Sequence, residues 1–206
     1  MIVTERLEQA CRDTARLVGI GYDYEKNLLW DQEAMLLMEL AGIQSRDGVI
    51  VEIGTYRGYS ACLMGGIRQA LGGKPVYTVD QSPMDSEDAK LARSRIAALG
   101  LQDHVFCINL PSDPATVHHL HTTIGWSERA SLLFIDGDHT EEAVVNDATI
   151  WLPMVAGGGL VAFHDRVRLN TVDAAIGRLI RPDESPVAAT LYLAAYMRDQ
   201  FCEPVS

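Results

Sequence analysis

The sequence has 206 residues, 48% of them hydrophobic and 22% charged, which suits one globular domain or one domain with a helical extension. Its formal net charge of −11 argues against nucleic acid and against an anionic membrane surface as partners, because both attract basic surfaces. The four cysteines are far apart, without the spacing of a zinc site, and no secretory signal pattern is present, so we expect free thiols in the cytoplasm.

Residues 1–45 are expected to be helical, because apolar residues recur there at helical spacing. A second helix is predicted to start at Asp31 as its N-cap. This extension either packs on the domain or acts as a lid over a cofactor, and its apolar face covers the sheet or a second subunit of a homodimer. Tyr22 and Tyr24 precede the lid helix and are candidates for substrate contact.

Residues 46–206 are predicted to form an α/β domain in which strands and helices alternate. Strands are expected at 49–53, 75–79, 104–108, 131–135 and 158–163. Helices are expected at 59–71, 86–98, 114–124, 140–150 and 171–181, and the apolar runs 187–192 and 194–198 could pair as a terminal hairpin. Such alternation predicts a doubly wound, mostly parallel sheet with helices on both faces.

The first strand leads into a glycine turn and then a helix. The turn contains Gly54 and Gly58 and follows a carboxylate, Glu52. Glycine allows a ligand to approach the backbone closely, and a helix N-terminus attracts anions, so this loop is a candidate seat for a ligand carboxylate. Glu52 would meet a cationic group of the same ligand. The turn is not the dinucleotide fingerprint, because Tyr56 and Tyr59 stand where further glycines are needed.

The second strand ends in Asp80. Ligands of open α/β sheets bind beyond the carboxyl ends of the strands, and a carboxylate there can accept hydrogen bonds from both hydroxyls of a ribose. The alternative is an aspartate that only caps the following turn.

The fourth and fifth strands end in acidic and imidazole side chains: Asp136, Asp138 and His139 after one, and His164 and Asp165 after the other. Carboxylates gathered in one cleft repel each other unless a cation or a proton intervenes, so a divalent metal on Asp136 and Asp165 is one hypothesis. Such a metal would also lower the pKa of a bound hydroxyl. His139 is the candidate general base, because a neutral imidazole can accept a proton near neutral pH.

Three motifs carry a family resemblance: Gly-Thr-Tyr-Arg-Gly-Tyr-Ser at residues 54–60, Ile-Asp-Gly-Asp-His at 135–139 and Phe-His-Asp at 163–165. The chain resembles class I S-adenosylmethionine-dependent methyltransferases, in the small O-methyltransferase branch with macrolide-sugar methyltransferases and cephalosporin-hydroxylase-like proteins. The resemblance implies a seven-stranded Rossmann-like sheet whose last strand is antiparallel.

The resemblance also implies roles for single residues. Cofactor contacts would come from Glu52, Gly54, Thr55, Tyr56, Gly58, Ser60, Asp80, Ser112 and Asp136. Ser112 would lie along the adenine, although it could equally be the N-cap of the next helix. Metal ligands would be Asp136, His164 and Asp165, and Asp136 would be catalytic together with His139 as base. His164 departs from the family, which often has a carboxylate there, and an imidazole favours manganese over magnesium.

The predicted activity is transfer of a methyl group from S-adenosylmethionine to a hydroxyl of a small molecule, a sugar or a natural product, with magnesium or manganese assistance. A nicotinamide-dependent oxidoreductase is an alternative, although the G-x-G pattern is missing. A non-catalytic nucleoside-binding module is another.

Overall fold

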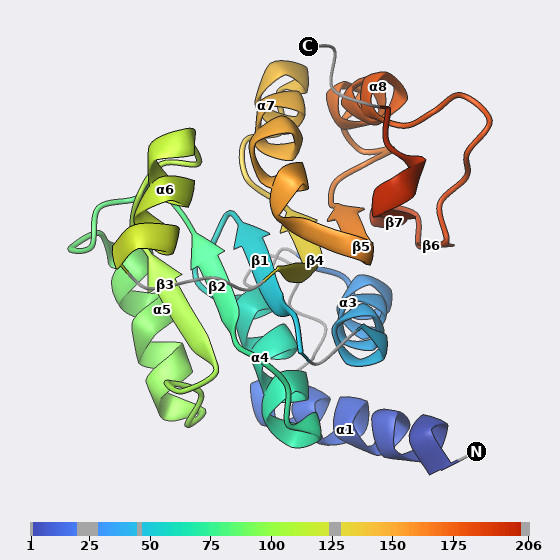
Figure 1. Cartoon of the computed structure of the whole chain (residues 1–206). Coiled ribbons are helices and arrows are strands. Elements are labelled where there is room, and N and C mark those ends of the chain that lie inside the picture. Colours follow the sequence, from blue (N-terminus) through green and yellow to red (C-terminus); the bar gives the residue numbers. More distant parts are fainter. Residues whose placement is uncertain (1, 20–28, 45–46, 124–128, 203–206) are drawn as a thin grey trace.

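A computed structural model of the chain describes residues 2–19, 29–44, 47–123 and 129–202 (Figure 1). Its α-helices are α1 (Ile2–Val18), α3 (Asp31–Ile43), α4 (Tyr59–Leu71), α5 (Glu87–Ala98), α6 (Pro114–Thr123), α7 (Glu141–Trp151) and α8 (Asn170–Leu179). Its strands are β1 (Val49–Ile53), β2 (Val76–Val79), β3 (Val105–Ile108), β4 (Ala130–Ile135), β5 (Val155–Phe163), β6 (Ala188–Ala189) and β7 (Ala194–Met197). Two short 3₁₀ turns, η1 (Leu152–Met154) and η2 (Arg198–Gln200), complete the elements.

The strands form one seven-stranded sheet in the order β3-β2-β1-β4-β5-β7-β6. The pairs from β3 to β5 are parallel, whereas β7 runs antiparallel to both β5 and β6. The predicted fold class, including the antiparallel last strand and the terminal hairpin, is therefore confirmed. The strand order reverses between β1 and β4, which is where open sheets of this kind place their ligands.

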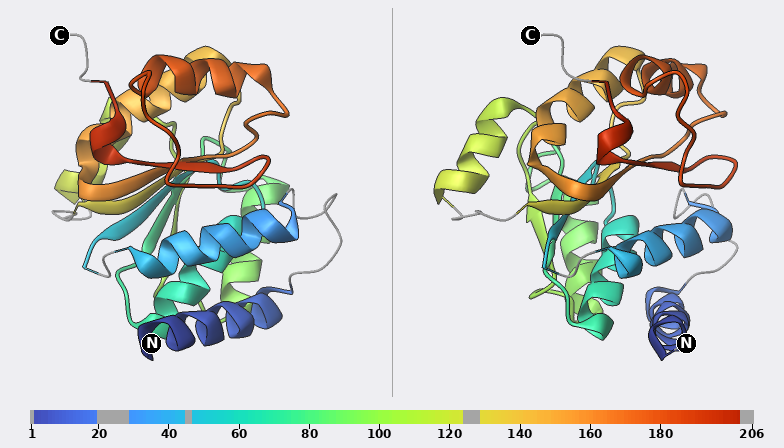
Figure 2. Two further views of the ribbon diagram at one scale, coloured as in Figure 1. Left: turned by 90° about the vertical axis from the view of Figure 1, so that its right-hand side faces the viewer. Right: turned by 45° about the vertical axis from the view of Figure 1, so that its right-hand side comes forward.

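The sheet lies between two helical layers, each with its own apolar core (Figure 2). One core gathers buried residues of α1, α3, α4 and α5 against one face. The other gathers buried residues of α6, α7 and α8 against the opposite face. Neighbouring residues of β1, such as Ile50 and Val51, belong to opposite cores, because successive side chains of a strand point to opposite faces.

Helices α1 and α3 both pack against α4, and buried residues of α3 share a core with residues of β4 and β5. The methyl group of Thr14 in α1 faces Gly66 of α4, where an added Cβ would lie 2.7 Å from Thr14 Cγ2. Asp31 is the first helical residue of α3, and Trp30 before it is extended, so the predicted N-cap is displaced by one residue. Tyr22 and Tyr24 lie outside the described residues. Within the described ranges, no helix is both long enough and apolar enough to cross a membrane.

Strand β5 begins at Val155, three residues before the predicted start at 158. The triple glycine at 157–159 continues the strand through an irregular pairing with β4. Gly158 has φ +77° at this irregularity, a conformation that glycine adopts without strain.

Candidate active site

A cavity of about 690 Å³ opens at the carboxyl ends of β1, β2, β4 and β5. It is lined by loop residues that follow each of these strands, among them Gly54, Asp80, Asp136 and Asp165. Its volume suits a small-molecule site. The cavity brings together in space four segments that the sequence singled out separately.

The glycine turn after β1 is built for close packing with β4. Gly54 has φ +98°, and an added Cβ would collide with the carbonyl oxygen of Asp136. Gly58 has φ +72° and is the N-cap of α4, where a Cβ would lie 3.1 Å from Cβ of Ala92. Tyr56 also has a positive φ, 44°, although it is not a glycine. Both glycines are therefore required for close packing within the protein, independently of any ligand.

The side chain of Asp80 binds backbone N–H groups of this turn. Its Oδ2 accepts hydrogen bonds from the N–H groups of Thr55 (2.9 Å) and Tyr56 (3.0 Å), and Oδ1 accepts one from the N–H of Ser82 (2.8 Å). Burial raises the pKa of Asp80, but hydrogen bonds from Ser82, Tyr56 and Thr55 outweigh it, so the pKa is lowered and the group is a carboxylate. The turn-capping role is thus present, and the ribose role stays a prediction for a residue that lines the cavity.

Glu52 lies behind the cavity wall. It is fully buried, is not among the lining residues, and accepts a hydrogen bond from the hydroxyl of Ser60, which does line the cavity. Within the described part of the chain, its Oε2 has no hydrogen-bond partner. Burial raises the pKa of Glu52 to about 8. The geometry does not support the predicted direct contact between Glu52 and a ligand, and any effect of Glu52 would pass through Ser60.

Ser112 lines the cavity but does not cap α6. The cap is Asp113, whose carboxylate accepts a hydrogen bond from the N–H of Thr116 (2.7 Å), so the N-cap alternative for Ser112 is wrong. The Ser112 hydroxyl donates to Asp147 Oδ1 (2.6 Å) and accepts from the indole N–H of Trp151 (2.9 Å). Asp147 also lines the cavity, and nothing in its position inside a helical sequence had indicated this.

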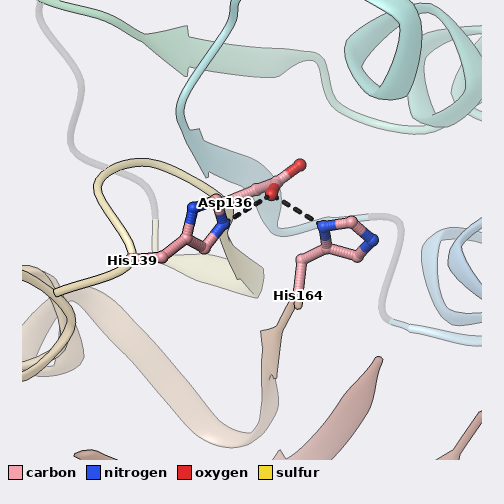
Figure 3. Close-up of side chains that lie close together, drawn as sticks. All are labelled: Asp136, His139 and His164. Carbon is pink, nitrogen blue, oxygen red and sulfur yellow. Dashed lines mark hydrogen bonds and ion pairs between the residues drawn. The ribbon is translucent and has the colours of Figure 1, made fainter. Parts of the chain in front are cut away.

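Two histidines converge on one carboxylate at the ends of β4 and β5 (Figure 3). Asp136 Oδ1 lies 2.9 Å from Nδ1 of His164 and 3.4 Å from Nε2 of His139. Nε2 of His139 also lies 3.7 Å from Oδ2 of Asp165, a residue with φ +52°. Four of the five side chains predicted to gather at this sheet edge are thus in mutual contact, whereas Asp138 lines the cavity and accepts the backbone N–H of Thr140.

The cluster is strongly coupled electrostatically. Burial lowers the pKa of His164, but Asp136 and then Glu33 raise it, and the result is about 10. Burial raises the pKa of Asp136, but the two histidines lower it below its usual range. The hydrogen bond with Asp136 raises the pKa of His139 above its usual value. A base at His139 is therefore in its active, neutral form only above that raised pKa.

Glu33 also belongs to this cluster, although no sequence pattern had indicated it. Its side chain is 2% exposed, and its Oε2 lies 3.3 Å from Nε2 of His164. The same oxygen accepts the backbone N–H of Trp30 (2.8 Å) at the start of α3. An acidic residue in the first turn of a helix is ordinary, so its position predicted only a helix start.

A metal could be held by this cluster with a changed ligand set. The group whose ligand atoms lie within 4.8 Å of one another consists of Asp136, His139 and His164, and it shares two members with the predicted set. Two imidazoles and one carboxylate suit a transition metal better than magnesium. Because a ligating imidazole must offer a lone pair, the metal would replace the proton between His164 Nδ1 and Asp136.

Residues 51–166 match a family model described as "Methyltransferase domain". The solved structure of CalS11, a TDP-rhamnose 3'-O-methyltransferase of calicheamicin biosynthesis, is similar with a TM-score of 0.63 and 16% identity over 92% of this chain and 93% of that chain. The O-methyltransferase NovP gives 0.63 and 16% over 95% and 99%. An O-methyltransferase from Bacillus cereus in complex with SAH gives 0.62 and 18% over 94% and 90%. At these identities the structural likeness concerns the fold.

Proposed function

The chain belongs to the methyltransferase-domain family, and we propose that it transfers the methyl group of S-adenosylmethionine to a hydroxyl group of a small molecule. One observation carries the proposal: a single cavity joins the glycine turn with Asp80 to the cluster of His139, Asp136 and Asp165. The first part can hold a nucleoside donor, and the second can hold and deprotonate a hydroxyl.

The donor half of the cavity would be lined by Gly54, Ser60, Asp80 and Ser112. The Asp80 carboxylate accepts three hydrogen bonds from backbone N–H groups, which leaves about one of its four lone-pair sites for a ribose hydroxyl. When bound, S-adenosylmethionine supplies an electrophilic methyl group. The tasks left to the protein are alignment of the attacking oxygen, removal of its proton and exclusion of water.

The acceptor half would rely on His139 as the base. Its Nε2 faces two carboxylates, Asp136 at 3.4 Å and Asp165 at 3.7 Å, so the tautomer with the proton on Nε2 is favoured. That tautomer leaves the lone pair on Nδ1, and this nitrogen would accept the proton of the acceptor hydroxyl. The two carboxylates would then stabilise the imidazolium that forms.

A sugar or another polyhydroxylated natural product is the acceptor class we propose. Near His139 in sequence or space, Asp138, Asp165 and Arg168 give the cavity polar side chains, and Leu29 and Leu169 add apolar ones to its lining. Hydroxyl-rich faces and apolar ring edges of such compounds match this mixture. The similarity to CalS11, a TDP-rhamnose 3'-O-methyltransferase, supports the same class.

Divalent-metal assistance is the second part of the proposal. A metal on Asp136 and His164, with Asp165 near it, would hold the acceptor hydroxyl and lower its pKa, and would leave His139 free to act as the base. A metal that also used Nε2 of His139 could not be combined with that base. The two arrangements differ in whether added metal rescues His139→Ala, because only a ligand position can be compensated by a higher metal concentration.

The experiment is donor binding followed by methyl transfer. Differential scanning calorimetry with S-adenosylhomocysteine, and with NAD as the comparison, decides the cofactor. A ligand that binds the native state raises the unfolding temperature. Binding of NAD and not of the sulfur nucleoside would favour an oxidoreductase. Donor binding without transfer from labelled S-adenosylmethionine to any panel of sugars, sugar nucleotides or phenols would favour a non-catalytic module. The homodimer and the cytoplasmic location remain predictions.

A further inference from the structure

We propose that Glu33 is a positioning residue, which orients His164 and Asp136 for catalysis and ties the start of α3 to the acceptor half of the cavity. The inference rests on the proposed function, since it assigns a task within the same site. It concerns a residue 131 positions from its partner in the sequence, on a helix outside the segment matched by the family model.

Within the described part of the chain, the Glu33 carboxylate makes polar contacts with two groups that have different tasks. Its Oε2 accepts the backbone N–H of Trp30 at 2.8 Å and faces Nε2 of His164 at 3.3 Å. Both Glu33 and His164 are almost fully buried, at 2% and 3% side-chain exposure. Among the described residues, the only ion pair given for Glu33 is the one with His164. Burial of a carboxylate without a cationic partner costs free energy, so the pairing with His164 stabilises Glu33 in its buried position.

The contact with Glu33 fixes the ring of His164, and this ring in turn contacts Asp136 in the cavity lining. Its backbone N–H donates to the carbonyl of Ile135 at 3.1 Å, which fixes the main chain, and its ring is held between Glu33 and Asp136. With Nε2 directed at Glu33, Nδ1 is directed at Asp136, the residue that also contacts His139 (Figure 3). Glu33 therefore selects the ring orientation that presents Nδ1 to the cavity side. This holds for a protonated ring and equally for a ring whose Nδ1 binds a metal, where a carboxylate behind the imidazole fixes its tautomer.

The Glu33 carboxylate also fixes the backbone next to Leu29, a residue that lines the cavity. Leu29, which lines the cavity and is buried, lies one residue before Trp30, whose N–H is bound by Glu33. The start of α3 is thus fixed to the end of β5 through one side chain. A change at Glu33 acts on the acceptor half, whereas the donor half, formed after β1 and β2, has its own hydrogen bonds.

The capping role and the positioning role can be separated by Glu33→Gln. Glutamine serves as well as glutamate in accepting a backbone N–H at this helix position, so the helix start is retained. The amide removes the negative charge that faces Nε2 of His164. Glu39→Gln is the matched control, because Glu39 is exposed on the same helix.

The test measures the ring-nitrogen resonances of His164 and His139 by NMR in the full chain saturated with S-adenosylhomocysteine. The His164 signal is assigned by its loss in His164→Gln. We expect both rings to shift in Glu33→Gln and neither to shift in Glu39→Gln, with donor affinity within about twofold of wild type because Glu33 does not touch the donor half. Once an acceptor is known, kcat should fall about 10-fold to 100-fold with little change in donor affinity.

Unchanged ring resonances in folded Glu33→Gln would overturn the proposal. If that variant does not fold, Glu33→Asp, which keeps the charge and shortens the reach, is measured in the same way with the same two outcomes. Failure of the wild-type protein to bind S-adenosylhomocysteine would overturn the proposed function instead, and the ring resonances would still decide the role of Glu33.

Discussion

Gly54 and Asp136 pack backbone against backbone, so that the carbonyl oxygen of Asp136 occupies the space of a Gly54 side chain. The glycine turn of the donor half is therefore in direct contact with the backbone of Asp136, whose side chain belongs to the acceptor half. They follow β1 and β4, the two strands between which the sheet order reverses. A donor and an acceptor bound on either side of this contact would meet within one cavity.

Gly54→Ala should disturb both halves. The added methyl group collides with backbone, and φ +98° is strained for alanine, so we expect a loss of about 1–3 kcal/mol in the free energy of unfolding together with weaker donor binding. Chemical denaturation and calorimetry measure these. Gly177→Ala is the control, because Gly177 lies in α8 with open space around its Cβ position. Equal behaviour of the two variants would contradict the contact described here.

Asp80→Asn should weaken the binding of S-adenosylhomocysteine. The amide cannot reproduce the charge that accepts three backbone hydrogen bonds and would face the ribose hydroxyls, so we expect a loss of about 1–3 kcal/mol in binding free energy. Calorimetric titration checks this, with Asp85→Asn, an exposed neighbour in the same loop, as control. An unchanged affinity would remove Asp80 from the donor site.

His139→Ala should lower kcat by about 10²-fold to 10⁴-fold while donor affinity stays nearly constant, because a general base acts only on the acceptor proton. His118→Ala, at an exposed position on α6, is the control. Because the pKa of His139 is raised by Asp136, the wild-type rate should rise with pH through a value above 6.5 and be lost as the pH falls through it. A base elsewhere is indicated if His139→Ala keeps normal turnover.

The stability of the protein should fall as the pH rises from about 4.5 to about 8, in part because of Glu52. The folded state keeps Glu52 protonated up to about pH 8, whereas the unfolded state releases the proton near 4.5, so deprotonation favours unfolding across this window. The contribution to the slope is at most about 1.4 kcal/mol per pH unit. Glu52→Gln should flatten the curve of unfolding free energy against pH within this window, and a curve parallel to wild type would contradict the buried, protonated state.

Chelation should lower turnover, and Mn²⁺ should restore it more fully than Mg²⁺, because the candidate ligands include imidazole. The measurement is methyl transfer after exhaustive EDTA treatment across a series of each metal. His164→Ala should be partly rescued by high metal concentration, and His139→Ala should not be rescued if His139 is the base. Full activity in protein shown by elemental analysis to be metal-free would leave Asp136 and Asp165 as hydrogen-bond acceptors.

The sequence by itself determined the elements and the strand ends. Period-2 and period-3.6 apolar patterns depend on neighbours within a few residues, so α4 and β1 have the predicted bounds, 59–71 and 49–53. Parallel strands place their carboxyl ends at one edge, so Asp80, Asp136 and His164 could be assigned to one site before their distances were known.

Only the tertiary structure decided which side chains meet across layers. Glu33 reaches His164 because α3 packs against the end of β5, and Ser112 reaches Asp147 because α7 lies beside the loop after β3. Glu52 faces Ser60 rather than the cavity because alternate residues of β1 point into opposite layers. These contacts join residues between 8 and 131 positions apart, and no local periodicity encodes them, since they depend on how whole elements pack.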